Sequence, residues 1–131
     1  MDRQRSVVLV DDDEDTRELL RAVFEADERF VVAGEAADGA SAVRLVAAAR
    51  PDVLVVDLQL PVIDGLRVID GAQRDSPATR VVVFTAFPDP FTLLDVLGRG
   101  GHALLNKATA WSELVPTIIR LCESPVDAVS G

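Results

Sequence analysis

Residues 53–65 carry the sequence VLVVDLQLPVIDG, and this stretch decides the fold class. Its first four residues, Val53 to Val56, are all apolar, whereas a strand with one solvated face alternates apolar and polar residues. Strands that are covered on both faces occur mainly in parallel sheets lying between helices. The run stops at Asp57, so a carboxylate directly follows the strand. The stretch therefore predicts an α/β protein with an acidic group at the carboxyl end of a buried strand.

Similar short apolar runs recur on both sides of this stretch. They occupy residues 7–10, 30–33, 81–84 and 103–105. Segments with helical spacing of apolar residues separate the runs, which predicts five strands alternating with five helices. Asp38 and Asp89 are expected to cap the second and fourth helices, and Phe91, Leu94 and Leu97 mark the fourth. This pattern is typical of a doubly wound five-stranded parallel sheet, whose functional loops follow the carboxyl ends of the strands.

Length and composition restrict the classes of protein. The chain has 131 residues, enough for one domain with a real core, and 49% of them are hydrophobic. A formal charge of -9 disfavours binding to nucleic acid by this segment, and the single cysteine, Cys122, excludes an intramolecular disulfide. No stretch is long and apolar enough for a membrane span, so we expect a soluble cytoplasmic domain. Residues 6–122 should form that domain, and residues 123–131 a linker or tail.

Polar side chains follow four of the expected strands. They are Asp11 and Asp12 after the first, Asp57 after the third, Thr85 after the fourth and Lys107 after the fifth. In a parallel sheet these strand ends open on one edge, so the side chains should meet. Three carboxylates in one pocket repel one another and need a positive partner. Magnesium prefers such oxygen ligands, and a lysine and a hydroxyl would complete a site for phosphoryl transfer.

Each of these residues has an ordinary structural explanation when taken alone. An aspartate after a strand usually caps a turn or a helix, and a single lysine is usually a solvated surface charge. Their joint occurrence at four strand ends favours a functional site. Asp13, in contrast, is expected to cap the first helix and not to bind a metal.

Four motifs together resemble the receiver domain of two-component response regulators. They are Val10-Asp11-Asp12, residues 51–65, Thr85-Ala86 and Leu105-Asn106-Lys107, and the resemblance spans about residues 6 to 122. It implies the flavodoxin-like strand order 2-1-3-4-5. Arg17 in the first expected helix and the run Leu114-Val-Pro-Thr-Ile118 further resemble receivers joined to LuxR-type DNA-binding domains.

The resemblance also implies a role for each site residue. Asp57 would accept a phosphoryl group from a sensor histidine kinase or a phosphotransfer protein. Mg²⁺ would be bound by Asp12, Asp57 and the backbone carbonyl of Gln59, with Asp11 acting mainly through water. Thr85 and Lys107 would contact the phosphoryl group. Such a domain phosphorylates and dephosphorylates itself without being a turnover enzyme, and it signals through a changed protein-contact surface.

Two positions depart from the common receiver pattern. Leu104 stands where many receivers carry an aromatic switch residue, and Ala108 replaces the proline that often follows the lysine. If the cis peptide bond that the resemblance implies at this position persists at Lys107-Ala108, it would cost about 3 kcal/mol. These departures leave the phosphoacceptor chemistry intact but not the usual output mechanism. We expect the fourth and fifth helices, with Trp111 near the edge, to offer a surface for a partner or a homodimer.

Three other functions share parts of this pattern. A receiver-like interaction module that is never phosphorylated keeps the same fold. An aspartate-nucleophile phosphatase would share the Asp11-x-Asp13 pattern, but Asp15 stands where such enzymes need a hydrophobic residue or threonine. A calcium loop starting at Asp11 fails because Thr16 and Ala22 replace its required glycine and glutamate.

Overall fold

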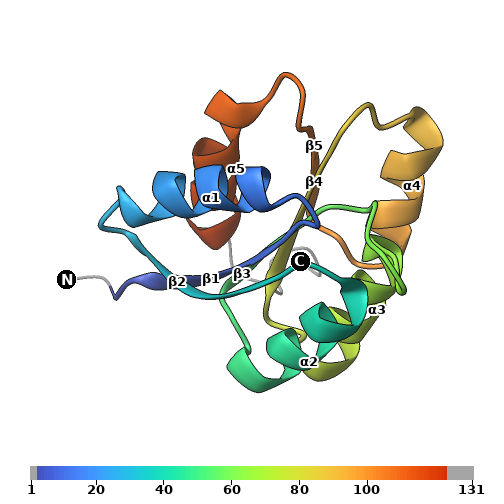
Figure 1. The fold of residues 1–131 in the computed structure, drawn as a ribbon, viewed down its shortest axis with the longest axis horizontal. Helices are drawn as coiled ribbons and strands as arrows, with labels where there is room; N and C mark the ends of the chain where they lie inside the picture. Colours follow the sequence, from blue (N-terminus) through green and yellow to red (C-terminus); the bar gives the residue numbers. More distant parts are fainter. Residues whose placement is uncertain (1–2, 124–131) are drawn as a thin grey trace.

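The computed structural model describes residues 3–123, which form one five-stranded parallel sheet and five helices (Figure 1). The strands are β1 (Arg5–Val10), β2 (Phe30–Ala36), β3 (Val53–Val56), β4 (Arg80–Thr85) and β5 (Ala103–Asn106). The helices are α1 (Glu14–Glu25), α2 (Gly39–Ala49), α3 (Gly65–Asp75), α4 (Pro90–Gly98) and α5 (Trp111–Glu123). The strand order is β2-β1-β3-β4-β5, which confirms the predicted flavodoxin-like α/β fold.

Helices cover both faces of the sheet, as the uninterrupted apolar strands predict. Helices α1 and α5 lie on one face, and α2 and α3 lie on the other (Figure 1). Successive residues of β3 point to opposite faces: Leu54 and Val56 pack toward α2 and α3, whereas Val53 and Val55 pack toward α1 and α5. All four are at most 1% exposed, so each side chain contributes about 1.5–3 kcal/mol of hydrophobic stabilisation.

Strand β2 extends three residues beyond the predicted end at residue 33. Gly34 and Glu35 hide this extension in the sequence because neither has high strand propensity. The strand lies at the edge of the sheet, where one side is open and polar residues are tolerated. Pairing with β1 nevertheless continues to Ala36, after a shift of register between Val7 and Val8.

Helix caps form where the sequence predicts them, but α4 is only shallowly buried. The side chain of Asp38 accepts the Ser41 amide, and that of Asp89 accepts the Thr92 amide. Only Val96 of α4 is buried, whereas Phe91 is 80% exposed. Helix α4 therefore presents most of its apolar side chains to solvent.

The structure also bears on the expected cis bond, the end of the domain and the expected lack of a membrane span. Every peptide bond of the described chain is trans, so Lys107-Ala108 does not adopt the cis form. Helix α5 ends at Glu123, and the rest of the expected linker, 124–131, lies outside the described residues. Among residues 3–123, no helix has the length and apolarity that a membrane crossing requires.

Candidate functional site

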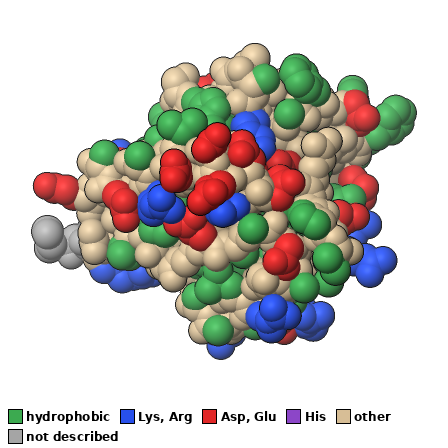
Figure 2. Space-filling view, viewed as in Figure 1, with side chains coloured by type: hydrophobic (Ala, Val, Ile, Leu, Met, Phe, Trp, Pro, Cys, Tyr) green, Lys and Arg blue, Asp and Glu red, His purple; other side chains and the backbone are tan. Residues whose placement is uncertain are grey.

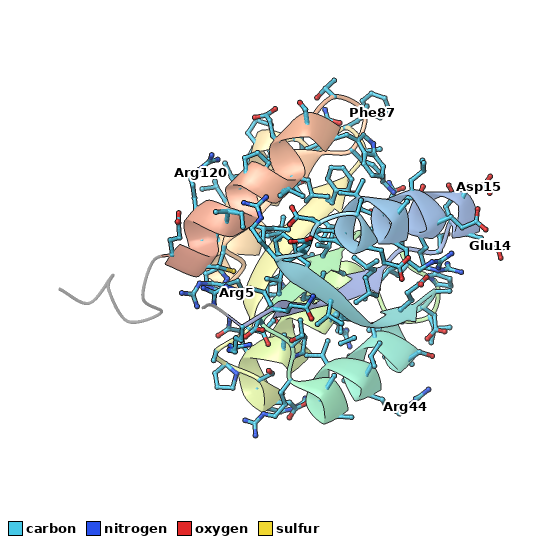
Figure 3. The ribbon with its side chains drawn as sticks, turned by 90° about the vertical axis from the view of Figure 1, so that its left-hand side faces the viewer. Arg5, Glu14, Asp15, Arg44, Phe87 and Arg120 are labelled. Carbon is cyan, nitrogen blue, oxygen red and sulfur yellow. The ribbon has the colours of Figure 1, made fainter. Side chains whose placement is uncertain are left out.

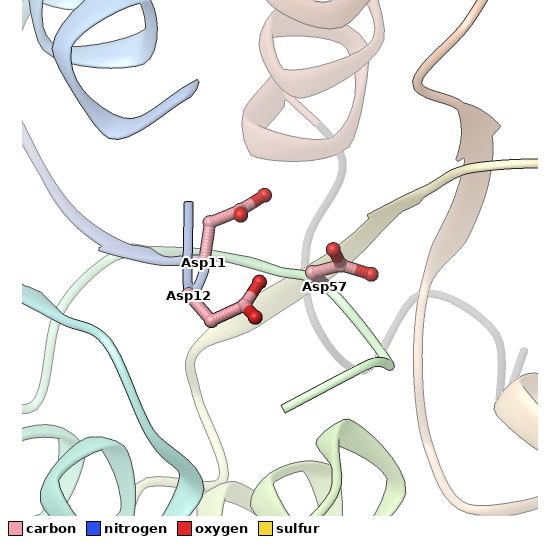
Figure 4. Close-up of side chains that lie close together, drawn as sticks. All are labelled: Asp11, Asp12 and Asp57. Carbon is pink, nitrogen blue, oxygen red and sulfur yellow. The ribbon is translucent and has the colours of Figure 1, made fainter. Parts of the chain in front are cut away.

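The carboxyl ends of β1 and β3 bring the acidic residues together. Val10 and Val56 are partners in the sheet, and the Asp57 amide donates to the Val10 carbonyl at 3.0 Å. Asp11, Asp12 and Asp57 each offer an oxygen within 4.8 Å of the others, and Figure 4 shows the three side chains lying close together. The acidic cluster, as we call these three residues, therefore forms at the edge that the strand pattern predicts.

Asp57 is the most extensively contacted member of the acidic cluster. Its side chain is 5% exposed, and its Oδ1 accepts hydrogen bonds from Thr85 Oγ1 at 2.7 Å and from the Gln59 amide at 3.2 Å. Its Oδ2 accepts from Lys107 Nζ at 2.7 Å. A hydroxyl and an ammonium, predicted from separate strand ends, thus both reach the Asp57 carboxylate.

Lys107 is shared between two carboxylates of the acidic cluster. Its Nζ also donates to Asp11 Oδ2 at 2.6 Å. Burial opposes the charged ammonium, but the hydrogen bonds to Asp11 and Asp57 outweigh burial and raise the pKa of Lys107. Burial raises the pKa of Asp11 as well, with Lys107 offsetting part of that effect. The lysine stays charged at neutral pH but can neutralise only one of the three carboxylates.

Asp12 is the exposed member of the acidic cluster. Within residues 3–123 no hydrogen bond or ion pair involves its side chain. The neighbouring Asp13 has a different role: its carboxylate accepts the Asp15 amide at 3.3 Å and the Thr16 hydroxyl at 2.7 Å. Asp13 is therefore the cap of α1, as predicted, and Asp12 is the acid with lone pairs free for another partner.

The donor set of the acidic cluster fits a small hard cation. Carboxylate oxygens converge from two strand ends, and their charge exceeds what Lys107 supplies. Magnesium takes few carboxylates and keeps several waters, which suits a site with one exposed ligand. Asp12 and Asp57 would hold the ion, and it would neutralise negative charge during phosphoryl transfer.

The loop from β3 to α3 passes very close behind Asp57. A Cβ atom on Gly65 would lie 2.4 Å from the Asp57 carbonyl oxygen and 2.6 Å from the Leu58 Cα. The Gly65 amide also donates to the Leu58 carbonyl at 3.0 Å. Glycine is needed here because a side chain would collide with the backbone of Asp57 and Leu58. The close return of the chain holds Asp57, the residue after β3, in place.

The structure adds one contact that the sequence analysis did not foresee. The guanidinium of Arg17, in α1, donates from Nη1 to the Asp11 carbonyl oxygen at 2.7 Å. An arginine on an amphipathic helix ordinarily faces solvent, so the position of Arg17 in its helix does not predict this contact. At the predicted switch position, Leu104 is half-buried. It packs against the part of the core that α2, α3 and α4 contribute to.

The family model for the response regulator receiver domain matches residues 7–119. This chain belongs to the response regulator receiver domain family. The match agrees with the strand order, and it assigns the receiver to two-component signalling.

Curated relatives share the receiver but differ in the rest of their length. The chain is 34% identical over 111 residues to the uncharacterized transcriptional regulatory protein YhcZ of Bacillus subtilis, covering 85% of this chain and 52% of the relative. It is 38% identical over 113 residues to protein-glutamate methylesterase/protein-glutamine glutaminase 2 of Anaeromyxobacter dehalogenans, covering 86% of this chain and 33% of the relative. The chain thus spans about half of one relative and a third of the other.

Solved structures show the same arrangement. A LuxR-family two-component response regulator from Aurantimonas sp. SI85-9A1 superposes with a TM-score of 0.86 at 29% identity, covering 92% of this chain and 86% of that one. The similarity to a LuxR-family regulator agrees with the resemblance drawn from the sequence.

Proposed function

We propose that this receiver accepts a phosphoryl group on Asp57 from a sensor histidine kinase or a phosphotransfer protein. The observation that carries the proposal is the set of contacts at Asp57: a hydroxyl, an ammonium and two further carboxylates surround one buried carboxylate. A structural aspartate does not need this combination, because capping a turn requires only backbone donors. We place the reaction in the cytoplasm, as the sequence analysis predicts.

The proposed reaction uses each of these contacts. An oxygen of Asp57 attacks the phosphorus of a phosphohistidine, the phosphorus–nitrogen bond breaks, and the imidazole leaves with the electron pair. Thr85 and Lys107, which now bond the Asp57 oxygens, would turn to the oxygens of the new acyl phosphate. Mg²⁺ bound by Asp12 and Asp57 and by the Gln59 carbonyl would supply charge neutralisation, with Asp11 acting through water. Water later hydrolyses the acyl phosphate and regenerates the Asp57 carboxylate.

Acetyl phosphate tests the proposal without a kinase. With Mg²⁺, intact-protein mass spectrometry should show one added phosphoryl group on the wild type and none on Asp57→Asn. Asp64→Asn is a matched control, because Asp64 lies in the same loop but caps α3 through the Arg67 amide. The control should be phosphorylated like the wild type. A wild type that stays unmodified would contradict the proposal.

The same experiment addresses the two alternatives. A receiver-like interaction module would show no added mass under any Mg²⁺ concentration. A phosphatase would release phosphate from a monoester over many turnovers, whereas a receiver releases phosphate only from its own acyl phosphate. The absence of an aromatic residue at Leu104 is the observation that keeps the interaction module in consideration.

We further propose that a second copy of the receiver binds at the fourth and fifth helices. The support comes from the α4 patch, which comprises Phe87, Phe91, Leu94 and Leu97, with exposed fractions of 81%, 80%, 68% and 48%. Figure 3 shows Phe87 projecting at the outer end of the domain. Exposed apolar areas of this kind commonly mark interaction sites. The excess of acidic residues on the chain makes nucleic acid an unsuitable partner for this segment.

A two-fold arrangement favours a second copy as the partner, because the α4 patch of one receiver would then cover the same patch of the other. Sedimentation with acetyl phosphate and Mg²⁺ should show a dimer that Leu94→Ser weakens and that Leu19→Ser, an exposed leucine of α1, leaves intact. A monomer at every concentration would contradict this partner.

A further inference from the structure

We propose that Arg17 is a positioning residue for the cation site, acting by holding the peptide between Asp11 and Asp12. The inference rests on the proposed Mg²⁺-dependent function and identifies a residue outside the acidic cluster that sets its affinity. Arg17 does not touch any carboxylate of the cluster. It touches the backbone that aims one of them.

The guanidinium of Arg17 is fixed from two directions. Nη1 donates to the Asp11 carbonyl oxygen at 2.7 Å, and Nε lies 3.4 Å from Glu35 Oε1. Glu35 projects from β2 and is itself bonded by Arg21, one turn further along α1. The side chain of Arg17 is 18% exposed and that of Glu35 is 24% exposed. Figure 2 shows basic side chains set among the acidic ones on this face of the molecule.

The contact with the carbonyl reaches Asp12 because a peptide unit is planar. The Asp11 carbonyl and the Asp12 amide belong to one rigid plane, so fixing the oxygen fixes the direction in which the chain enters Asp12. Asp12 has no side-chain partner of its own among residues 3–123, so the backbone is what directs its Cβ, and with it the carboxylate, toward the cluster. Asp11, in contrast, is anchored independently by Lys107 and by the Asp13 amide.

The effect of Arg17 should be geometric more than electrostatic. A free positive charge near the acidic cluster would compete with a cation, but the guanidinium faces Glu35, which offsets part of its charge while also pairing with Arg21. The planar guanidinium of arginine can donate to a carbonyl while another of its nitrogens lies beside a carboxylate, which a single ammonium cannot do with the same geometry. Loss of the guanidinium would let the Asp11-Asp12 peptide rotate and would cost affinity, not capacity for chemistry.

Arg21 provides a matched control for this inference. It binds the same Glu35 from the same helix, but it makes no contact with the Asp11 carbonyl. If Arg17 served only to attach α1 to β2, then Arg17→Gln and Arg21→Gln would behave alike. If Arg17 positions Asp12, only the first variant should lose affinity for the cation.

The test is a titration of the full chain with MgCl₂ by calorimetry at constant ionic strength. We expect Arg17→Gln to raise the dissociation constant for Mg²⁺ about 10-fold. This is the lower end of the loss of affinity that follows when a residue supporting a metal ligand is replaced. Arg21→Gln should stay within about twofold of the wild type. The Mg²⁺ concentration giving half-maximal phosphorylation by acetyl phosphate should rise in parallel for Arg17→Gln, while the rate at saturating Mg²⁺ remains that of the wild type.

The outcomes separate the inference from the proposed function. A wild type that binds no Mg²⁺ would overturn the proposed function. A wild type that binds Mg²⁺ with Arg17→Gln binding equally well would overturn only the role of Arg17, and equal losses in Arg17→Gln and Arg21→Gln would do the same. Should Arg17→Gln fail to fold, Arg17→Lys keeps the charge beside Glu35, and the inference still requires it to bind Mg²⁺ more weakly.

Discussion

Replacing Asp12 by asparagine should make the protein more stable than the wild type without magnesium and less stable than the wild type with magnesium. Asp12 lies within 4.8 Å of carboxylate oxygens of both Asp11 and Asp57, whereas Lys107 bonds those two residues and not Asp12. The substitution therefore removes two repulsions and no attractive contact. Without a divalent ion, Asp12→Asn should be more stable than the wild type.

The magnitude follows from the separation of the charges. Two unit charges at this separation repel by about 1 kcal/mol in a water-like dielectric and by about 3.5 kcal/mol at an effective dielectric constant of 20. Asp12 is exposed, so the lower figure applies to each of its two repulsions. Lys107 bonds both Asp11 and Asp57 and offsets about one of the two repulsions, so we expect the free energy of unfolding of Asp12→Asn to exceed that of the wild type by about 1 kcal/mol in EDTA.

Magnesium should then change the order of the two proteins. A ligand at one hundred times its dissociation constant stabilises the folded state by about 2.7 kcal/mol. The wild type should gain about this much, and Asp12→Asn, which lacks a proposed metal ligand, should gain little. The wild type should thus become the more stable protein at saturating Mg²⁺.

Urea unfolding followed by fluorescence measures both differences. Trp111 is the only tryptophan in the chain, and its ring packs edge-on against Phe84, with centroids 4.9 Å apart, so unfolding changes its surroundings. Asp13→Asn is the control, since it removes a neighbouring negative charge and keeps a side chain that can cap α1. It should respond to Mg²⁺ as the wild type does. If Asp12→Asn is the less stable protein in EDTA, or if Mg²⁺ stabilises it as much as the wild type, the repulsion argument is wrong.

Three other predictions concern the support of the site and of the sheet. Hydrogen bonds from Arg3 lower the pKa of Asp52 to about 2, so Asp52→Asn should cost about 1 kcal/mol at pH 7, a figure reduced for solvent exposure, and the cost should vanish in acid unfolding curves between about pH 4 and 2. Gly65→Ala should slow phosphorylation by acetyl phosphate without abolishing Mg²⁺ binding, because the new Cβ displaces the Asp57 carbonyl. Burial lowers the pKa of His102, whose Nδ1 accepts the Val81 amide, so wild-type stability should fall as the pH drops below about 6.5, and His102→Gln should flatten that dependence in urea titrations.

Much of the site could be predicted because each part lies at the end of a strand with a clear local pattern. The apolar run before Asp57 marks a buried parallel strand, and the same holds for the runs before Asp11 and Thr85. Parallel strands open on a common edge, so proximity follows from topology without any knowledge of side-chain packing. The distances among Asp11, Asp57 and Thr85 agree with that reasoning.

The exposure of α4 could not be predicted from the pattern that defines the helix. Phe91, Leu94 and Leu97 recur with helical spacing, which normally marks the face toward the core. The helix is short and only Val96 packs inward, so the apolar spacing describes an outer surface. Hydrophobic periodicity shows that residues share a face, but it does not show whether that face is covered.

The sequence by itself determined the fold class, the strand ends and the acidic residues, because these depend on local hydrophobic patterns and on the geometry shared by all parallel sheets. Only the tertiary structure decided how Lys107 divides its ammonium between Asp57 and Asp11, which lies 96 residues away. It also decided that Arg17 reaches the Asp11 carbonyl. Such contacts depend on side-chain rotamers and on how closely elements pack, and both are set by the whole core at once.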